Sequence, residues 1–212
     1  ATYCFVDNVA VKGVHKVPGL NDESNEYFYQ FNETTGACEG KVTGLFELDG
    51  ARYYTINGIL RSGWWSLLDE NGEESYYYFD KNTFKGLNGK TQRFFANLTY
   101  EFENGKLIRG DWLTTNSGTK YYYGPVYVYG KWFAVDGNRY YFDQNGYRYE
   151  GLRYVKETNN HDDPGYWYNF GEDGVCHGVY QHTGLFQLNG DTYYTINGTV
   201  CNGLYLAEDG YY

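Results

Sequence analysis

An internal repeat limits the possible folds of this chain more than any other feature. Residues Thr43–Gly63 return as Thr183–Gly203 at an offset of 140 residues (183 − 43), and 13 of the 21 aligned positions are identical. Chance does not produce a match of this length and identity. The repeat indicates an architecture in which similar supersecondary units follow one another along the chain.

The repeated stretch predicts a small β-hairpin. The doublet Tyr53-Tyr54 alternates into Ile56, and this pattern of aromatic and β-branched residues is typical of a half-buried strand. Asn57-Gly58 follows, and both residue types accept the positive φ that tight hairpin turns require. Gly63 then allows the chain to bend toward the next unit.

The same unit recurs along the whole chain. An aromatic residue or isoleucine that ends a first strand returns every 19 to 28 residues, at Phe5, Phe31, Ile56, Phe79, Phe102, Tyr123, Phe142, Phe170 and Ile196. Turn glycines follow most of these positions: Gly36, Gly58, Gly105, Gly146, Gly174 and Gly198. An isolated hairpin is marginally stable in water, so such hairpins must stack to bury their rings.

We therefore predict an all-β fold, a β-solenoid of stacked short β-hairpin repeats. The chain is interpreted as a single repeat domain over residues 1–212 with about nine hairpin units. Residues 27–63 and 166–203 are predicted to be equivalent two-hairpin blocks. No stretch favours a helix, because strong helix formers do not accumulate and glycine interrupts every ten or so positions.

Composition predicts a core of aromatic rings. The chain has 27 Tyr, 13 Phe and 5 Trp but no Met, and Leu, Ile and Val are sparse. Such a surplus of rings can also supply flat binding platforms at the surface. The formal net charge of −10 argues against a nucleic acid partner and against attachment to anionic lipid, and no apolar run approaches the roughly 20 residues of a membrane helix. We expect no nucleic acid, membrane, cofactor or metal partner.

The four cysteines do not form a CxxC pair, so a zinc site is not predicted. Cys176 and Cys201 each follow a hairpin turn, one repeat apart, and stacked hairpins would bring them together. We therefore expect a disulfide between Cys176 and Cys201 and, by elimination, one between Cys4 and Cys38. Disulfides would place the protein outside the cell or on its surface, and four buried free thiols are the alternative.

Two stretches resemble a known repeat family. Gly63-Trp64-Trp65 with Tyr76-Tyr77-Tyr78-Phe79 and Gly86, and the stretch Gly130–Gly151, resemble the cell-wall-binding or glucan-binding repeat. This family includes choline-binding modules, the glucan-binding domains of glucansucrases and the C-terminal repeats of clostridial toxins. The resemblance implies stacked hairpins that bind choline or sugars between neighbours. The absence of Met weighs against the choline type, in which a Met often completes the site.

Candidate binding residues follow from the rings and from the resemblance. A tryptophan can lie against the C–H face of a pyranose while polar neighbours orient it. The candidates for carbohydrate binding are Trp64, Trp65, Trp112, Trp132, Trp167, Tyr140, Lys85 and Arg109. Each ring could instead belong to the core. Trp64 and Trp65 are adjacent on a strand and face opposite sides, so one of them is expected to face outward.

Catalysis finds little support in the sequence. A glycosidase needs two carboxylates held about 5–10 Å apart in a cleft, and small hairpins offer no deep cleft. His161-Asp162-Asp163 is interpreted as a solvated loop rather than a metal cluster. We predict a non-catalytic carbohydrate-binding module for an α-glucan of the starch or dextran type, part of a larger secreted bacterial protein. A cell-wall anchor for choline or another envelope polymer, and an adhesin or toxin segment that binds host glycan or protein, are the alternatives.

Overall fold

A computed structural model describes residues 1–68, 72–92, 95–156, 165–201, 206–207 and 210–211. The chain forms two compact units. One consists of Ala1–Asp111 with Tyr123–Val126, and the other of Trp112–Tyr122 with Tyr127–Tyr212. Among the described residues, no helix is long and apolar enough to span a membrane.

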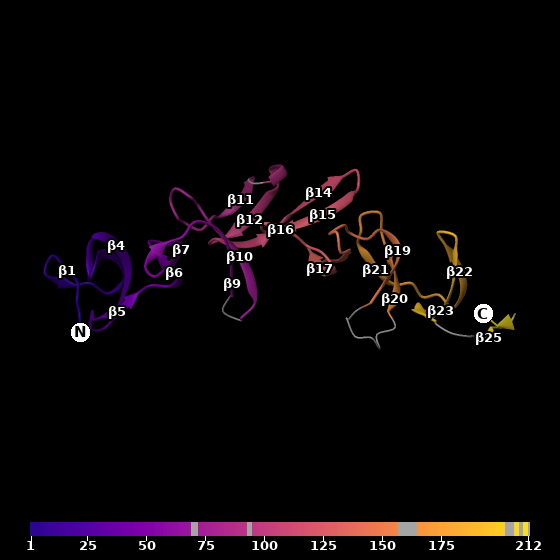
Figure 1. Ribbon diagram of the computed structural model, residues 1–212, viewed down its shortest axis with the longest axis horizontal. Coiled ribbons are helices and arrows are strands. Elements are labelled where there is room, and N and C mark those ends of the chain that lie inside the picture. The colour runs from indigo at the N-terminus through magenta and orange to yellow at the C-terminus, as the bar shows by residue number, and fades with distance from the viewer. Residues whose placement is uncertain (69–71, 93–94, 157–164, 202–205, 208–209, 212) are drawn as a thin grey trace. The chain divides into compact units, whose positions relative to one another are not determined.

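The regular structure is almost entirely β, as predicted (Figure 1). The strands of the first part of the chain are β1 (Phe5–Val6), β2 (Val9–Ala10), β3 (Gly13–Gly19), β4 (Asp22–Phe31), β5 (Cys38–Lys41), β6 (Gly44–Leu48), β7 (Ala51–Ile56), β8 (Ile59–Leu60), β9 (Gly63–Leu68), β10 (Glu74–Phe79), β11 (Gly89–Gln92), β12 (Thr99–Glu103) and β13 (Lys106–Arg109). A single 3₁₀ turn, η1 (Phe95–Asn97), interrupts them in the part that the structure describes.

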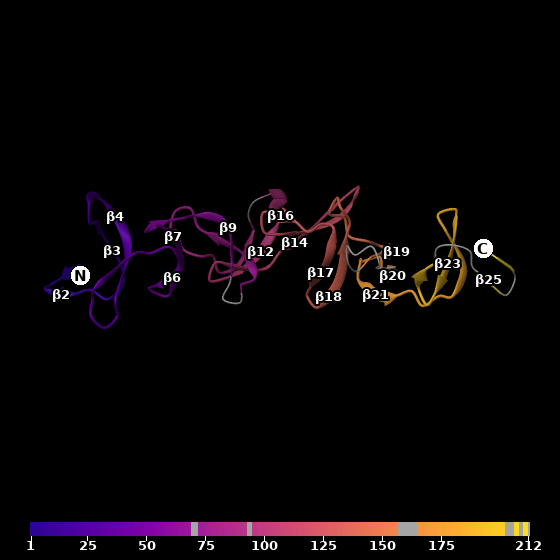
Figure 2. The ribbon, with the colours of Figure 1, turned by 60° about the horizontal axis from the view of Figure 1, so that its bottom comes forward.

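The strands that follow are also short. They are β14 (Asp111–Thr115), β15 (Gly118–Tyr123), β16 (Val126–Tyr127), β17 (Lys131–Val135), β18 (Asn138–Phe142), β19 (Gly151–Val155), β20 (Tyr166–Phe170), β21 (Cys176–Val179), β22 (Gly184–Leu188), β23 (Asp191–Ile196), β24 (Thr199–Val200), β25 (Leu206–Ala207) and β26 (Gly210–Tyr211). The strands form small sheets such as β3-β4-β5, β6-β7-β8 and β19-β20-β24-β23-β22, in which neighbouring strands are antiparallel. The two-stranded pair β17-β18 is clear in Figure 2.

The hairpins form because their turns carry residues that accept positive φ. Asn57 and Gly58 have φ of 52° and 75°, and Asn197 and Gly198 have φ of 52° and 79°, so the predicted turns are confirmed. The structure adds turns of the same kind that the repeat analysis did not single out, at 49–50, 136–137 and 189–190. In each of them Asp or Asn precedes Gly, and both residues have positive φ.

Backbone hydrogen bonds join consecutive hairpins within each unit. The Phe28 amide donates to the Gly58 carbonyl, and the Val42 amide donates to the Phe28 carbonyl, both at 2.9 Å. The corresponding bonds in the second block are Trp167 N–H to Gly198 O at 2.9 Å and Tyr180 N–H to Trp167 O at 2.7 Å. Hairpins therefore associate through their main chains as well as their rings. The count of nine units and their grouping as one domain stay predictions.

The predicted aromatic core is confirmed. Among the described residues, buried rings outnumber buried aliphatic side chains, and Phe79 and Phe142 are fully enclosed. Neighbouring rings meet at centroid distances of about 5 to 6.5 Å, as Tyr54 and Phe79 do at 6.1 Å and Trp132 and Tyr168 at 4.9 Å. Rings from successive hairpins thus replace the aliphatic core of an ordinary domain.

Candidate functional site

Three tryptophans occupy equivalent positions on first strands, each against two rings of a later hairpin. Trp64 on β9, Trp112 on β14 and Trp132 on β17 are all half-buried. Their ring partners, with centroid distances, are Tyr100 and Phe102 (both 5.6 Å) for Trp64, Tyr140 (4.9 Å) and Phe142 (6.0 Å) for Trp112, and Tyr168 (4.9 Å) and Phe170 (5.9 Å) for Trp132. Each of the three tryptophan rings therefore packs against other rings of the core and keeps part of its own surface exposed.

Trp64 and Trp65 pair across the sheet with different neighbours, as expected for adjacent strand residues. Trp64 lies opposite Tyr78, and Trp65 lies opposite Tyr77. The Trp65 ring also packs on Tyr54 at 4.9 Å, and its indole N–H donates to the Ser62 carbonyl at 3.1 Å. Both tryptophans are half-buried, so each retains partly exposed surface.

Trp167 and Tyr140 lie in the interior. Trp167 is 6% exposed, and its ring meets Phe186 at 5.4 Å and Tyr193 at 4.9 Å. Tyr140 is 8% exposed beside Trp112. Burial raises the pKa of Tyr140, and the charge of Asp173 raises it further, so this hydroxyl stays protonated well above neutral pH.

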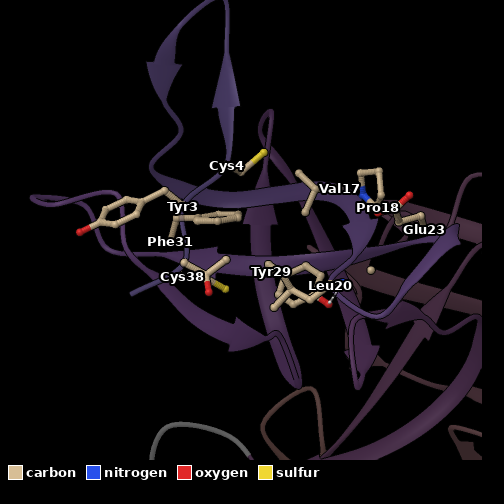
Figure 3. Close-up of a pocket in the computed structure, with 11 residues that line it drawn as sticks. Tyr3, Cys4, Val17, Pro18, Leu20, Glu23, Tyr29, Phe31 and Cys38 are labelled. Carbon is tan, nitrogen blue, oxygen red and sulfur yellow. Dashed lines mark hydrogen bonds between the residues drawn. The ribbon is translucent and has the colours of Figure 1, made fainter.

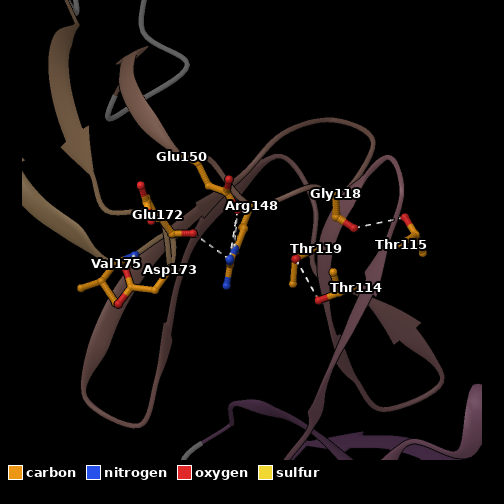
Figure 4. A network of polar contacts seen from close by, with 9 residues as sticks. All are labelled: Thr114, Thr115, Gly118, Thr119, Arg148, Glu150, Glu172, Asp173 and Val175. Carbon is orange, nitrogen blue, oxygen red and sulfur yellow. Dashed lines mark hydrogen bonds and ion pairs between the residues drawn. The ribbon is translucent and has the colours of Figure 1, made fainter.

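The surroundings of Trp112 combine a ring with fixed polar groups. The guanidinium carbon of Arg148 lies 5.7 Å from the Trp112 ring centroid. Arg148 donates through Nε and Nη2 to Glu150 Oε1 at 3.1 and 3.0 Å, and Nη2 also donates to the Glu172 carbonyl at 3.0 Å (Figure 4). Only 18% of the Arg148 side chain is exposed. The guanidinium is therefore held in one orientation near a partly open indole.

Glycine makes room for this arrangement. Gly174 has φ of 75°, and a Cβ at this position would lie 2.6 Å from Arg148 Cδ. On the neighbouring hairpin, the hydroxyls of Thr114 and Thr119 lie 3.0 Å apart (Figure 4).

The sequence analysis missed Arg148, because its position depends on a carbonyl contributed 24 residues further along the chain.

The two cationic candidates are exposed and lie at the closing positions of their hairpins. Lys85 precedes Gly86, and Arg109 ends β13. Both belong to the first unit, with Trp64 and Trp65, whereas Trp112, Trp132, Trp167 and Tyr140 belong to the second. Of the candidates, the structure brings Trp112 and Tyr140 into direct contact. The segment with His161-Asp162-Asp163 lies outside the described residues.

A cavity of about 470 Å³ opens in the hairpin formed by β3 and β4 (Figure 3). Its lining includes the rings of Tyr3, Tyr29 and Phe31, with Glu23 also contributing. A register shift between Pro18 and Gly19 distorts the end of this hairpin, and such bulges bend a strand. The sequence analysis did not predict the cavity. The Pro18-Gly19 pair, which interrupts a strand pattern, was the available signal.

The predicted disulfide between Cys4 and Cys38 is wrong for this structure, in which all four cysteines are free thiols. The bridge between Tyr3 and Ala37 sets the two cysteines diagonally across an antiparallel pair rather than opposite one another. Diagonal Cα atoms are about 7–8 Å apart, beyond the span of most disulfides. Both side chains instead pack beside the cluster of Val11, Tyr29 and Phe31.

The predicted disulfide between Cys176 and Cys201 is also wrong here. Cys176 pairs with Phe170 at one end of β20, whereas Thr199 pairs with Tyr166 at the other end. Four residues of strand span roughly 13 Å, and Cys201 lies beyond Thr199, so the two thiols cannot meet. Spacing in the sequence placed both cysteines near turns but did not show which end of the strand each would reach.

No protein-family model matches the chain, and no curated protein sequence matches it. Solved structures are similar at low identity. CbpJ from Streptococcus pneumoniae TIGR4 is 20% identical over 99% of this chain and 75% of its own, with a TM-score of 0.32. Choline binding protein F from Streptococcus pneumoniae is 20% identical over 98% of this chain and 90% of its own, with a TM-score of 0.30.

An alternansucrase in complex with isomaltononaose is also similar. It is 20% identical over 96% of this chain and 17% of its own, with a TM-score of 0.40. The chain is thus similar to choline-binding proteins and to a glucansucrase, the two kinds of protein that its sequence resembles.

Proposed function

We propose that this chain is a non-catalytic carbohydrate-binding module that binds an α-glucan of the starch or dextran type. The observation that carries the proposal is the half-buried Trp112 ring beside an immobilised Arg148 guanidinium. An indole face suits the C–H face of a pyranose, and a fixed donor nearby selects the orientation of the sugar hydroxyls. The parent protein is proposed to be larger, secreted and bacterial.

The polar groups at this position support binding rather than catalysis. The Glu150 carboxylate accepts two hydrogen bonds from Arg148 and thereby anchors the guanidinium. Trp64, Trp65 and Trp132 are also half-buried and are proposed as further platforms. Trp167 and Tyr140 support their neighbours from the interior. Lys85 and Arg109 remain proposed partners of the sugar hydroxyls.

Each platform covers few sugar rings, so a single site is expected to be weak. We expect a dissociation constant on the order of 10 µM to 1 mM per site, because a shallow surface recovers little of the cost of ordering the ligand. Several sites on one polymer would raise the avidity by about 10²-fold or more without new contacts. Such avidity favours a polymer over a short oligosaccharide as the physiological ligand.

Native electrophoresis through gels that contain starch, dextran or neither polymer tests the proposal. The wild-type protein should be retarded by at least one glucan, and Trp112→Ala and Arg148→Gln should each reduce that retardation about tenfold. Trp167→Phe is the matched control, because it changes a buried indole and should leave retardation unchanged. Circular dichroism confirms that each variant is folded. Wild-type protein that migrates equally in all three gels would exclude the α-glucan.

A further inference from the structure

The ammonium group of Lys120 is enclosed by two tyrosine rings of its own chain. Lys120 Nζ lies 3.9 Å from the ring centroid of Tyr127 and 4.4 Å from that of Tyr147. The same atom donates to the Asn145 carbonyl at 2.6 Å. All four residues belong to the second unit, and we refer to Tyr127, Tyr147 and the Asn145 carbonyl as the tyrosine clamp.

The tyrosine clamp is built by close contacts between rings and glycines. The Tyr127 ring lies so near Gly146 that a Cβ at this glycine would overlap it. The Tyr147 ring lies against Gly118, where a Cβ would be 2.9 Å from Tyr147 Cδ1. The Tyr147 amide donates to Asp143 Oδ1 at 2.8 Å, which fixes the turn that carries this ring. The clamp is therefore formed by the fold and not by Lys120 alone.

The clamp lies apart from the Trp112 ring. Tyr121, the neighbour of Lys120 on β15, packs against Trp112 at 4.8 Å. Successive strand residues point to opposite faces, so Lys120 projects away from that indole. A change at Lys120 can therefore be made without altering the groups proposed to contact sugar.

Two aromatic faces and a carbonyl oxygen form a binding site for a cation. Such sites attract ammonium groups through the negative faces of the rings, and quaternary ammonium ligands are recognised in this way. The net charge of −10 would also concentrate external cations near the protein. A clamp of this composition would accept an external ammonium group if Lys120 did not fill it.

A second lysine shows a similar arrangement in the other unit. Lys41 Nζ lies 3.2 Å from the ring centroid of Tyr27 and 6.0 Å from that of Tyr29. The Tyr27 hydroxyl donates to Asp22 Oδ2 at 2.8 Å. Lys41 is exposed, whereas Lys120 is half-buried, so Lys120 is the more completely enclosed cation.

We propose that Lys120 is a specificity-determining residue that fills the tyrosine clamp and thereby excludes external quaternary ammonium ligands. This inference rests on the proposed function, because it gives the module a preference for neutral polysaccharide over polymers that carry quaternary ammonium groups. Removal of the lysine side chain opens a site for such a ligand. Replacement by arginine keeps a cation between the rings and keeps the site closed.

Titration with tetramethylammonium chloride, followed by NMR of the tyrosine ring signals, tests the proposal. Lys120→Ala and Lys120→Ser should bind the probe at millimolar concentration, at least about tenfold more tightly than the wild type or Lys120→Arg. The shifted signals should belong to Tyr127 and Tyr147, and adding Tyr127→Ala to Lys120→Ala should abolish binding. Equal binding by the wild type and Lys120→Ala would overturn the proposal. So would absence of binding by both folded alanine and serine variants.

Glucan retardation measured on the same proteins separates this inference from the proposed function. If Lys120→Ala gains cation binding but no variant is retarded by glucan, the clamp assignment stands and the α-glucan assignment fails. If glucan retardation is normal and the alanine and serine variants bind no cation, the clamp assignment alone fails. Retained glucan binding in Lys120→Ala also shows that the substitution leaves the Trp112 region intact.

Discussion

The two stretches predicted as equivalent blocks, 27–63 and 166–203, share the hydrogen bonds of their turns and of their buried threonines but differ in other side chains. In 27–63, the Asn57 amide donates to Thr43 Oγ1 at 2.9 Å, and in 166–203 the Asn197 amide donates to Thr183 Oγ1 at 3.0 Å. Thr55 donates to the Val42 carbonyl and Thr195 to the His182 carbonyl, both at 2.9 Å and both from fully buried side chains. The turn residues and the buried threonines are therefore the features that the two stretches have in common.

The copies differ where a hairpin joins the next. The offset between equivalent residues is 139 at Phe28 and Trp167 (167 − 28), 138 at Cys38 and Cys176 (176 − 38), and 140 at the threonines that follow (183 − 43). The second copy is therefore one residue shorter than the first between Trp167 and Cys176. It is two residues longer between Cys176 and Thr183. In the first copy, the Val42 amide donates to the Phe28 carbonyl, and the Val42 carbonyl accepts from the Gly58 amide. In the second copy two residues share these bonds, because the Tyr180 amide donates to the Trp167 carbonyl and the His182 carbonyl accepts from the Gly198 amide.

A tryptophan in this fold can be a core residue, so the residue type alone does not mark a binding position. Trp167 replaces Phe28 at a position with the same backbone bonds, and the two are 6% and 7% exposed. The Phe28 ring meets Phe46 at 5.3 Å, and the Trp167 ring meets Phe186 at 5.4 Å. Both rings are core residues, in contrast to the half-buried Trp112.

The largest effect should follow loss of these core rings. Phe28→Ala and Trp167→Ala should each lower the free energy of unfolding by about 3–5 kcal/mol, because each leaves a cavity between two hairpins. Trp167→Phe should cost less than about 1.5 kcal/mol, since it reproduces the first copy and removes an indole N–H with no acceptor among the described residues. Urea denaturation followed by circular dichroism measures the three values. A tolerated Trp167→Ala would show that the copies are not equivalent here.

A smaller but still large effect should follow substitution of the turn glycines. A Cβ at Gly58 would lie 2.8 Å from the Phe28 carbonyl oxygen, and one at Gly198 would lie 2.6 Å from that of Tyr180. Both glycines also have positive φ, so Gly58→Ala and Gly198→Ala should each cost roughly 2–4 kcal/mol.

Gly50→Ala and Gly190→Ala are the matched controls for this prediction. These glycines have φ of 72° and 90°, but nothing lies within 4 Å of the added Cβ. Backbone strain alone should cost about 1 kcal/mol at these positions. If the two pairs lose the same stability, contact between hairpins is not what requires glycine at Gly58 and Gly198.

The smallest effect should come from the buried threonine hydroxyls. Both valine substitutions keep the side-chain shape, and the carbonyl that accepts from the threonine retains a second donor, the amide of Gly58 or Gly198. Thr55→Val removes the bond to the Val42 carbonyl, whereas Thr195→Val removes the bond to the His182 carbonyl and also a 3.2 Å bond with His182 Nδ1. Each substitution should therefore cost about 1 kcal/mol. Thermal unfolding should show a lower melting temperature for both variants, with the shift of Thr195→Val at least as large as that of Thr55→Val, and a shift confined to one copy would contradict the equivalence of the blocks.

The sequence predicted the features that depend on neighbouring residues. Asn57-Gly58 and Asn197-Gly198 have the positive φ that their turns require, and the core consists mainly of rings. It could not separate Trp112 from Trp167, because both occur within aromatic strand patterns, and the difference in burial arises from other hairpins. The positions of Arg148 and of the cysteines depend likewise on which strand ends meet, which local spacing does not specify.

Indole N–H signals in an NMR titration with maltoheptaose and isomaltoheptaose provide the most direct test of the distinction between binding and core tryptophans. The Trp112 signal should shift with one of the two oligosaccharides, with a midpoint on the order of 10 µM to 1 mM. The Trp167 signal should stay in place, because its ring is enclosed by Phe186 and Tyr193. A shift of Trp167 with Trp112 unchanged, or no shift with either oligosaccharide, would contradict this assignment.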